Sequence, residues 1–218
     1  MTPDDRIRKR AKAHIRYKNK DGKVVPGTTT ICGELAKPYL VKWANNLGLD
    51  GISSEDYRDI AADIGTLIHL MVQCDLQGVT PDTTDFTKSD IEAAENGLLK
   101  WYEWKKGKVI KPILIETPLV SELHQYGGTI DLYAEVDGAL NLIDFKSGKS
   151  VYSEHFIQLA AYKHLLKEHN YPVNKARILR IGRDESEGFE DRLQTDLMAQ
   201  WEIFEHLRAI YDLKKKVA

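Results

Sequence analysis

The dipeptide Asp137-Gly138 most constrains how this 218-residue chain can fold. It lies between two runs of alternating apolar residues, and Asp-Gly readily adopts the positive φ angles of a tight hairpin turn. If these two residues form the turn, the register places Asp131 directly opposite Asp144, with Cβ atoms about 4.5–5.5 Å apart. The sequence therefore predicts a β-hairpin that brings two carboxylates together.

Two facing carboxylates destabilise a sheet unless another group compensates their charge. Strand alternation places Lys146 on the same face as Asp144. Mg²⁺ and Mn²⁺ prefer oxygen ligands, and a lysine beside such an ion can orient a water or stabilise a phosphate during hydrolysis. The opposite face is expected to be the core-facing one, and it carries Ile130, Leu132, Ala134, Ile143 and Phe145. The pattern predicts a metal site on one face of the hairpin and a hydrophobic core behind it.

The tripeptide Asp-x-Lys is a weak signal on its own, because the chain holds further copies that begin at Asp21 and Asp212. The first copy is typical of a surface turn, and the second falls at the expected end of a helix. The copy at Asp144 differs because Asp131 faces it, and a shift of one residue would move the two acids to opposite faces. A generic α/β protein whose paired acids hold a structural ion therefore stays open.

The composition is that of one globular domain, with 42% apolar and 29% charged residues. No apolar run is long enough to cross a bilayer and no signal-peptide pattern is present, so we expect a cytoplasmic protein without membrane association. Cys32 and Cys74 are too few and too far apart for a disulfide framework or a zinc or iron–sulfur site, which predicts two buried thiols. The net charge of −2 does not indicate a nucleic-acid binder, but lysines and arginines crowd residues 6–23, which either contact phosphates or are simply solvated.

Hydrophobic periodicity predicts helices before and after a central mixed sheet, which is an α/β sandwich. The expected helices cover residues 34–47, interrupted by Pro38, and 55–77, 89–106, 153–169 and 195 onward. The expected strands are 109–120, the two arms of the hairpin, 176–182 and 188–193, with a small N-terminal hairpin formed by 13–19 and 23–31. We interpret residues 1–218 as a single domain, with an N-terminal appendage at 1–50, a core at 55–182 and a C-terminal helix at 195–218.

Four further residues have ambiguous patterns when taken singly. Glu116 lies within an apolar strand, where an acid either belongs to the exposed face or is a third metal-facing carboxylate. A lone histidine on an apolar helix, such as His69, is more often a satisfied core group than a metal ligand. Gln158 and Tyr162 are one helical turn apart and share a face, as ordinary packing residues also do.

Taken in order, however, five short motifs resemble the RecB-type branch of the PD-(D/E)xK nucleases. They are Gly65-Thr66-Leu67-Ile68-His69, Glu116, Gly127-Gly128-Thr129-Ile130-Asp131, Ile143-Asp144-Phe145-Lys146 and Gln158-Leu159-Ala160-Ala161-Tyr162. They span about half of the chain, and the segments 27–31 and 37–44 look like the part that precedes the histidine helix in phage exonucleases and small Cas4-like members. The resemblance implies a restriction-endonuclease-like α/β/α core with a central mixed sheet.

The resemblance also implies a role for each matching residue. The implied metal ligands are His69, Asp131, Asp144, the Phe145 carbonyl and Glu116, of which Glu116 is the loosest match and is alternatively a water-orienting group. Lys146 matches the catalytic lysine, which acts together with Asp144, Asp131 and Glu116. Gln158, Tyr162 and Thr66 match positions that contact DNA or support the lysine. Ile130 replaces the proline that this family often has before the first aspartate.

The function that the resemblance implies is a metal-dependent DNA exonuclease of phage-type recombination, repair or replication, using one or two Mg²⁺ or Mn²⁺ ions. Two cysteines cannot hold an iron–sulfur cluster, which places the chain with the cluster-free members. The substrate would be single-stranded DNA or duplex ends, in a bacterial or phage-infected host cytoplasm. No GxxxxGK[ST] phosphate loop is present, so unwinding would need a partner such as a helicase. A recombinase or single-strand-binding protein as partner, the oligomeric state, a structure-specific endonuclease and a catalytically silent DNA-binding or assembly module of the same fold all stay open.

Overall fold

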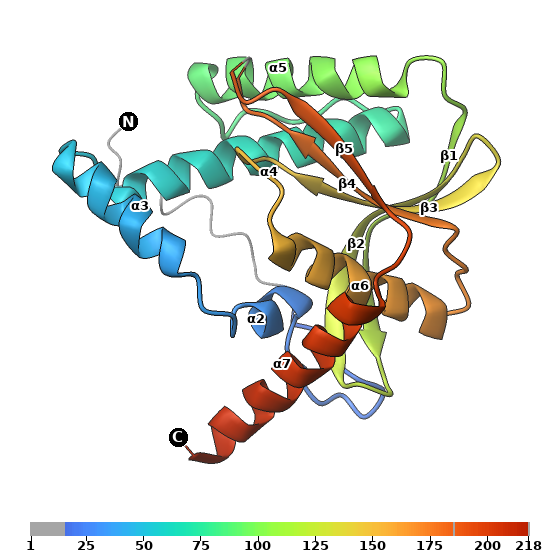
Figure 1. Cartoon of the computed structure of the whole chain (residues 1–218). Coiled ribbons are helices and arrows are strands. Elements are labelled where there is room, and N and C mark those ends of the chain that lie inside the picture. Colours follow the sequence, from blue (N-terminus) through green and yellow to red (C-terminus); the bar gives the residue numbers. More distant parts are fainter. Residues whose placement is uncertain (1–15, 185, 218) are drawn as a thin grey trace.

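The computed structural model describes residues 16–184 and 186–217, which form a five-stranded mixed sheet between two layers of helices (Figure 1). The strands are β1 (Ile110–Ser121), β2 (Tyr126–Val136), β3 (Ala139–Lys146), β4 (Lys175–Ile181) and β5 (Phe189–Gln194), and they lie in sequence order. Neighbouring strands are antiparallel except β3 and β4, which are parallel. The predicted α/β sandwich is confirmed.

The hairpin of β2 and β3 has the predicted register. Asp137 and Gly138 have φ angles of 50° and 79°, as a two-residue primed turn requires. Residue pairs run from Val136 with Ala139 to Leu132 with Ile143, and the paired ladder ends one residue before Asp131 and Asp144. Beyond Leu132, β2 continues with β1 alone past the helix that follows β3 (Figure 1).

Helices cover both faces of the sheet, so both faces are hydrophobic cores. On one face α4 (Ser54–Gln77) and α5 (Lys88–Lys105) pack against Leu132, Ala134, Ile143 and Phe145. On the other face α2 (Thr28–Cys32), α6 (Ser153–Glu168) and α7 (Met198–Val217) pack against Tyr133 and Leu142. The prediction of a single core-facing side of the hairpin was wrong, because helices also cover the face that carries Tyr133 and Leu142. Ile130 is buried in this second core, since it lies on the part of β2 that has separated from β3.

Helix ends follow local capping chemistry. Ser53 accepts a hydrogen bond from the Asp56 backbone N–H at the start of α4, and the left-handed Gly78 ends that helix. The predicted helix at 34–47 is instead α3 (Pro38–Leu49). Pro38 begins this helix rather than interrupting it, because the first turn needs no backbone N–H from the proline. The last helix begins at Met198, three residues after its predicted start.

The predicted N-terminal hairpin is mostly absent from the described residues, and its residues 13–15 lie outside them. Lys18 and Val24 form an isolated antiparallel bridge around the left-handed Gly22, but residues 28–32 are helical. This segment packs on the start of β2, where Thr28 Oγ1 donates to the Gly127 carbonyl over 2.9 Å. Tyr17 Oη lies 2.9 Å from Thr129 Oγ1 in the same region.

Within the described residues, no helix is both long and apolar enough to span a membrane. Cys32 and Cys74 are free and buried, as predicted. Burial is also the main reason why the pKa of Cys32 rises to about 11, which keeps its thiol protonated. The residues at 6–15, which include most of the basic N-terminal cluster, lie outside the described part of the chain.

Candidate active site

Three of the predicted metal ligands converge from three different elements. His69 lies on α4, Glu116 on β1 and Asp131 on β2, and one ligand atom from each lies within 4.8 Å of the others. His69 Nδ1 is 3.8 Å from Glu116 Oε1. Residues 69, 116 and 131 are therefore close enough to contact one ion together.

Asp144 and Lys146 form a buried ion pair at the end of β3. Only 1% of the Asp144 side chain is exposed, and its Oδ2 lies 2.6 Å from Lys146 Nζ. Apart from that ion pair, neither oxygen of Asp144 has a hydrogen-bond partner among the residues that the structure describes. Asp131 Oδ2 accepts a hydrogen bond of 2.8 Å from the Phe145 backbone N–H, which ties the two aspartate positions together.

The site holds three acidic side chains but only two basic ones, His69 and Lys146. Burial, followed by the charge of Asp144, raises the pKa of Asp131 to about 7. Burial alone would lower the pKa of His69, but Glu116 and Asp131 raise it overall. The pKa of Lys146 is likewise raised, because Asp144 and Asp131 outweigh the effect of burial. An additional cation would relieve this excess of acidic groups.

Glu116 has a strained backbone, with φ at 44° in the middle of β1. It lies between the pairs Ile115 with Leu132 and Thr117 with Ile130, which places it across from Asp131. A left-handed non-glycine residue costs about 1–3 kcal/mol and persists only where the surrounding structure enforces it. Glu116 was expected to be either a residue of the exposed face or a third carboxylate facing the metal. Its carboxylate lies 3.8 Å from His69, which favours the second interpretation.

The donor set fits a hard divalent cation. Carboxylate oxygens of Glu116 and Asp131 with one imidazole nitrogen suit Mg²⁺ or Mn²⁺. Asp144 Oδ1 is a further sign, because it is buried without a hydrogen-bond partner among the described residues and such an oxygen is costly unless an ion or water satisfies it. The Phe145 carbonyl remains a predicted ligand only.

The supporting residues lie on the neighbouring helices. Gln158 Nε2 donates to Tyr162 Oη over 2.7 Å, so the pair that shares a face of α6 is also bonded. Burial, with Asp144 and Asp131 nearby, raises the pKa of Tyr162 well above its usual range. Only 5% of Tyr162 is exposed, which leaves little of its ring for contact with DNA. Thr66 is partly exposed on α4.

Arg180 and Gly65 position the segment after Lys146, and sequence reasoning assigned neither of them this role. Arg180 pairs with Lys146 in the parallel register of β3 and β4, and it donates to the carbonyls of Gly148 and Glu187 over 3.2 and 2.7 Å. A Cβ at Gly65 would lie 2.1 Å from Ser147 Oγ and 3.2 Å from its Cβ. The role of Arg180 could have been suspected from the sequence, because it is an arginine within the apolar run that ends β4.

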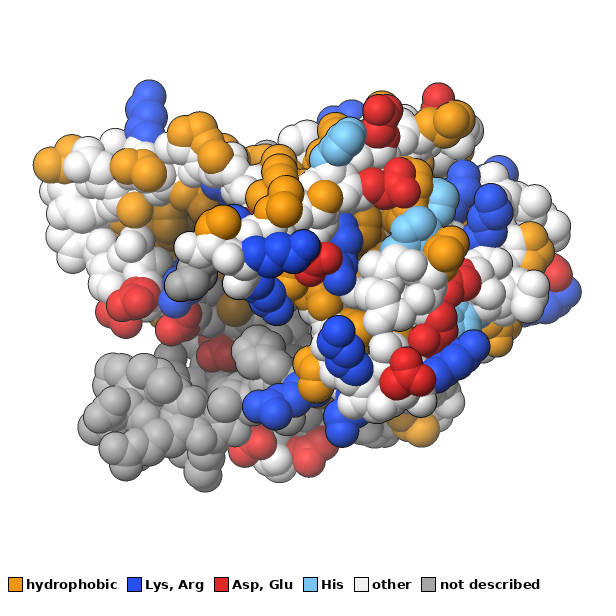
Figure 2. Space-filling view, turned by 90° about the horizontal axis from the view of Figure 1, so that it is seen from below, with side chains coloured by type: hydrophobic (Ala, Val, Ile, Leu, Met, Phe, Trp, Pro, Cys, Tyr) orange, Lys and Arg blue, Asp and Glu red, His pale blue; other side chains and the backbone are white. Residues whose placement is uncertain are grey.

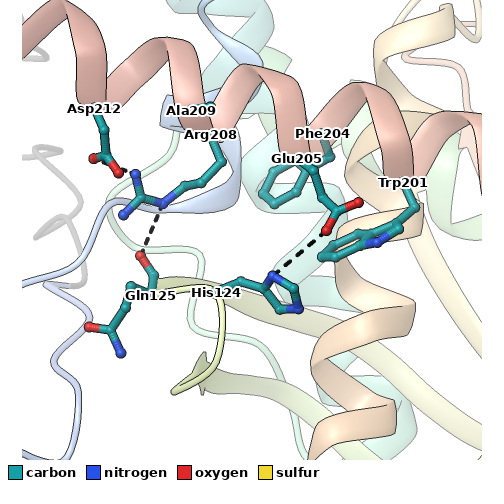
Figure 3. Close-up of a pocket in the computed structure, with 8 residues that line it drawn as sticks. All are labelled: His124, Gln125, Trp201, Phe204, Glu205, Arg208, Ala209 and Asp212. Atoms are coloured by element: carbon teal, nitrogen blue, oxygen red, sulfur yellow. Dashed lines mark hydrogen bonds and ion pairs between the residues drawn. The ribbon is translucent and has the colours of Figure 1, made fainter.

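A cavity of about 360 Å³ lies elsewhere, between α7 and the turn that joins β1 to β2 (Figure 3). It is lined by His124, Gln125, Trp201, Phe204, Glu205, Arg208, Ala209 and Asp212. Its polar side chains are already engaged, since His124 Nδ1 lies 4.0 Å from Glu205 and Arg208 Nε donates to the Gln125 carbonyl. No predicted site residue lines it, so this cavity is separate from the acidic cluster.

Among the residues that the structure describes, the face seen from below has no single basic surface (Figure 2). Lysine and arginine side chains lie interspersed with aspartate and glutamate, and apolar side chains gather on the side where α3 lies (Figures 1 and 2). Val41 and Leu49 of α3 are 74% and 79% exposed. The described residues of this face therefore do not form a broad basic patch of the kind that binds DNA.

Comparison with known proteins gives one family. The model described as the PD-(D/E)XK nuclease superfamily matches residues 41–214. The mixed five-stranded sheet with helices on both sides is consistent with the restriction-endonuclease-like fold. The comparison with curated proteins found no match.

The solved structures that are similar to this chain include two exonuclease structures at low identity. One is a protein from Eubacterium rectale named as an exonuclease, with 12% identity and a TM-score of 0.47 over 69% of this chain and 65% of that protein. The other is an alkaline exonuclease from Laribacter hongkongensis, with 12% identity and a TM-score of 0.34 over 72% of this chain and 90% of that protein. The match thus spans about two thirds of the Eubacterium protein's length.

Proposed function

Because this chain belongs to the PD-(D/E)XK nuclease superfamily, we propose that it is a metal-dependent deoxyribonuclease that acts as an exonuclease. The observation that carries the proposal is the convergence of His69, Glu116 and Asp131 beside the buried pair of Asp144 and Lys146. The acids and the lysine come from β1, β2 and β3, so the sheet itself holds the groups in place.

In this proposal His69, Glu116, Asp131 and Asp144 hold one or two Mg²⁺ or Mn²⁺ ions, with the Phe145 carbonyl as a further ligand. A bound ion would lower the pKa of a water and offset charge on the scissile phosphate. The hydrogen bond from the Phe145 N–H to Asp131 fixes the orientation of that carboxylate.

Lys146 acts as a hydrogen-bond donor rather than as a base. Its raised pKa keeps the ammonium protonated at neutral pH, and its contact with Asp144 aims Nζ at the acidic cluster. From there it can donate to a phosphate oxygen or to the attacking water. Gln158 and Tyr162 support this end of the site from α6, and Thr66 flanks it on α4.

We propose residues 1–218 as one nuclease domain with its catalytic core at 55–182. It would work on DNA in the bacterial or phage-infected cytoplasm, in phage-type recombination, repair or replication. Two cysteines cannot supply the four ligands of an iron–sulfur cluster, which supports a cluster-free enzyme.

The test is to incubate the purified protein with linear and circular DNA, single- and double-stranded, in Mg²⁺, Mn²⁺ or EDTA. Asp144→Asn should lower the rate at least ~10²-fold. Asp21→Asn alters the equivalent Asp-x-Lys tripeptide in an exposed turn and should leave the rate unchanged.

The substrates separate the remaining possibilities. Metal-dependent loss of linear DNA alone establishes an exonuclease, whereas cleavage of circles establishes an endonuclease. DNA binding without any cleavage would contradict the proposal and favour a silent binding module of the same fold.

A further inference from the structure

We propose that Tyr39 and Tyr152 form a platform on which one unpaired base of a DNA strand stacks as that strand enters the active site. The proposal rests on the proposed nuclease function and names the form of DNA that the site takes. Tyr152 lies in the loop after Lys146, and Tyr39 lies in the first turn of α3. Neither residue is among the catalytic, metal-binding or DNA-contacting residues predicted from the sequence.

The two rings are stacked on each other and open to solvent. Their centroids are 5.5 Å apart with an angle of 10° between the planes. Tyr39 is 43% exposed and Tyr152 is 40% exposed, so a large part of each aromatic surface remains free to contact a ligand. Every residue of α3 is at least partly exposed, so the packing of α3 into the core does not account for this aromatic pair.

Glu154 holds the Tyr39 ring of the platform in position through a hydrogen bond. Tyr39 Oη donates to Glu154 Oε1 over 2.7 Å, and Lys37 Nζ lies 3.1 Å from the same oxygen. A carboxylate that holds a tyrosine and a lysine together pre-organises an aromatic surface with a cation beside it. The flat ring suits a base, and the ammonium suits the phosphate attached to that base.

The platform contacts a histidine on which the charge of the catalytic lysine acts. Tyr152 contacts the ring of His155 edge-on at 5.5 Å, and its backbone N–H donates to His155 Nδ1 over 3.2 Å. Burial and then the charge of Lys146 lower the pKa of His155 to about 4, so the imidazole that contacts Tyr152 is neutral at pH 7. Burial raises the pKa of the Cys32 thiol, and the charges of Lys37 beside the platform and of Lys146 in the site both act on it in the opposite direction.

An unpaired base is the occupant that this chemistry favours. Bases inside a duplex are already stacked and cannot present a face to a protein ring, whereas a single strand or a frayed end can. Aromatic rings next to a cation are the usual means by which proteins hold single-stranded nucleic acid. Apolar peptides would not need the adjacent lysine or the nearby acidic site.

The test combines removal of the base with removal of the ring. Binding of short fluorescent single-stranded oligonucleotides is measured by anisotropy with the Asp144→Asn protein in EDTA, which limits cleavage, with an abasic nucleotide placed at each position in turn. One position, or two adjacent ones, should lower affinity about 5- to 150-fold, the range for a lost base–aromatic stack. Tyr152→Ala should cause a loss of the same size, and the abasic nucleotide should then cause no further loss.

Matched variants separate stacking from folding. Tyr39→Phe and Tyr152→Phe keep the rings and should retain the sensitivity to the abasic position. Tyr102→Ala removes a tyrosine that is also 40% exposed, on α5, and should have no effect. The melting temperature of each variant shows whether it is folded.

The proposal is overturned if no position is sensitive, if the losses from the base and from the ring multiply independently, or if duplex DNA binds as tightly as single strands. Cleavage by the wild-type protein is measured separately. Cleavage without the coupled loss would refute the platform alone, and the coupled loss without cleavage would refute the nuclease function alone.

Discussion

The ring of Tyr162 occupies the space beside Gly128 where any other residue would place a Cβ atom. Such an atom would lie 2.5 Å from Tyr162 Cε1, 2.9 Å from Thr28 Oγ1 and 3.0 Å from Leu165 Cδ1. Two motifs that are separate in the sequence are thus one packing unit, in which β2 and α6 touch directly behind the aspartates.

Gly128→Ala should destabilise the protein, because three buried groups would have to move. Overpacking of this kind costs about 1–3 kcal/mol in the free energy of unfolding, and each kcal/mol lowers the melting temperature by about 2–4 °C. Gly48→Ala is the control, since nothing lies within 4 Å of its added methyl group and alanine favours the helix. Urea unfolding of both variants measures the difference, and equal stability would contradict this account of Gly128.

Lys146→Met should destabilise the metal-free protein more than Asp144→Asn does. The first substitution leaves a carboxylate that is 1% exposed without its cation, and removing one partner of a buried pair costs about 3–5 kcal/mol. The second leaves Lys146, which is 20% exposed and can reach water. Melting temperatures in EDTA test the order, and a double variant that recovers much of the loss from Lys146→Met would identify the unpaired Asp144 as its cause.

Asp131→Asn should raise the melting temperature in EDTA at pH 8 by a few degrees while weakening metal binding. The pKa of Asp131 is about 7 in the folded protein against an ordinary 3.8, so the folded state retains a proton that the unfolded chain loses. The unfolding free energy of the wild type should therefore fall as the pH rises from about 4 to 7. The asparagine carries no charge and removes that penalty.

Addition of Mn²⁺ should reverse this order. A ligand that binds only the folded state adds about 2.7 kcal/mol at a hundred times its Kd, and the wild type retains the carboxylate that holds the ion. Asp21→Asn should behave like the wild type in both conditions. Equal gains on Mn²⁺ addition for the wild type and Asp131→Asn would exclude Asp131 as a ligand.

His164 should make the protein sensitive to acid. Its ring stacks on Trp201 with centroids 3.6 Å apart, and burial, followed by the charges of Lys167 and His124, lowers its pKa from 6.5 to about 4. The unfolded chain takes up this proton below about pH 6.5 while the folded protein does not, so stability is lost as the pH falls from about 6.5 to 4.

His164→Phe keeps a ring against Trp201 and should reduce that loss. The contribution is below about 1.4 kcal/mol per pH unit, because the ring is partly exposed and solvent screens it. Denaturant melts at pH 7.5 and 5 compare this variant with His206→Gln, which alters an exposed histidine of α7. If His164→Phe loses as much stability as the wild type between pH 7.5 and 5, groups other than His164 cause the acid sensitivity.

Local chemistry made much of the fold predictable. Asp137-Gly138 determines its own turn, and the register then follows residue by residue to Leu132 and Ile143. The convergence of His69 and Asp131 was expected only from the order of the motifs, because periodicity cannot show which elements meet across a sheet. Glu116 adopts a conformation that its residue type disfavours in the middle of a strand, so local preference could not predict it and surrounding tertiary contacts must enforce it.

Tertiary context also explains the wrong predictions. A second helical layer turns both faces of the hairpin into cores, which alternation alone cannot distinguish from one core and one solvent face. Pro38 gives the same letter pattern whether it begins or breaks a helix. The region around Thr28 looked like a strand because its threonines favour β structure, yet its docking on Gly127 is helical.

The contacts between the N-terminal segment and β2 determine when this segment can dock during synthesis on the ribosome. Thr28 is separated from its partner Gly127 by 99 residues, and Tyr17 is separated from Thr129 by 112. The segment therefore emerges long before the surface on which it docks, and Lys214 closes over Glu34 only after a further delay, across 180 residues. The contacts of Thr28 and Tyr17 cannot form before residues 127 and 129 have been made, and the contact of Lys214 with Glu34 forms only when translation is nearly complete, so the N-terminal segment stays accessible to proteases and chaperones for longest.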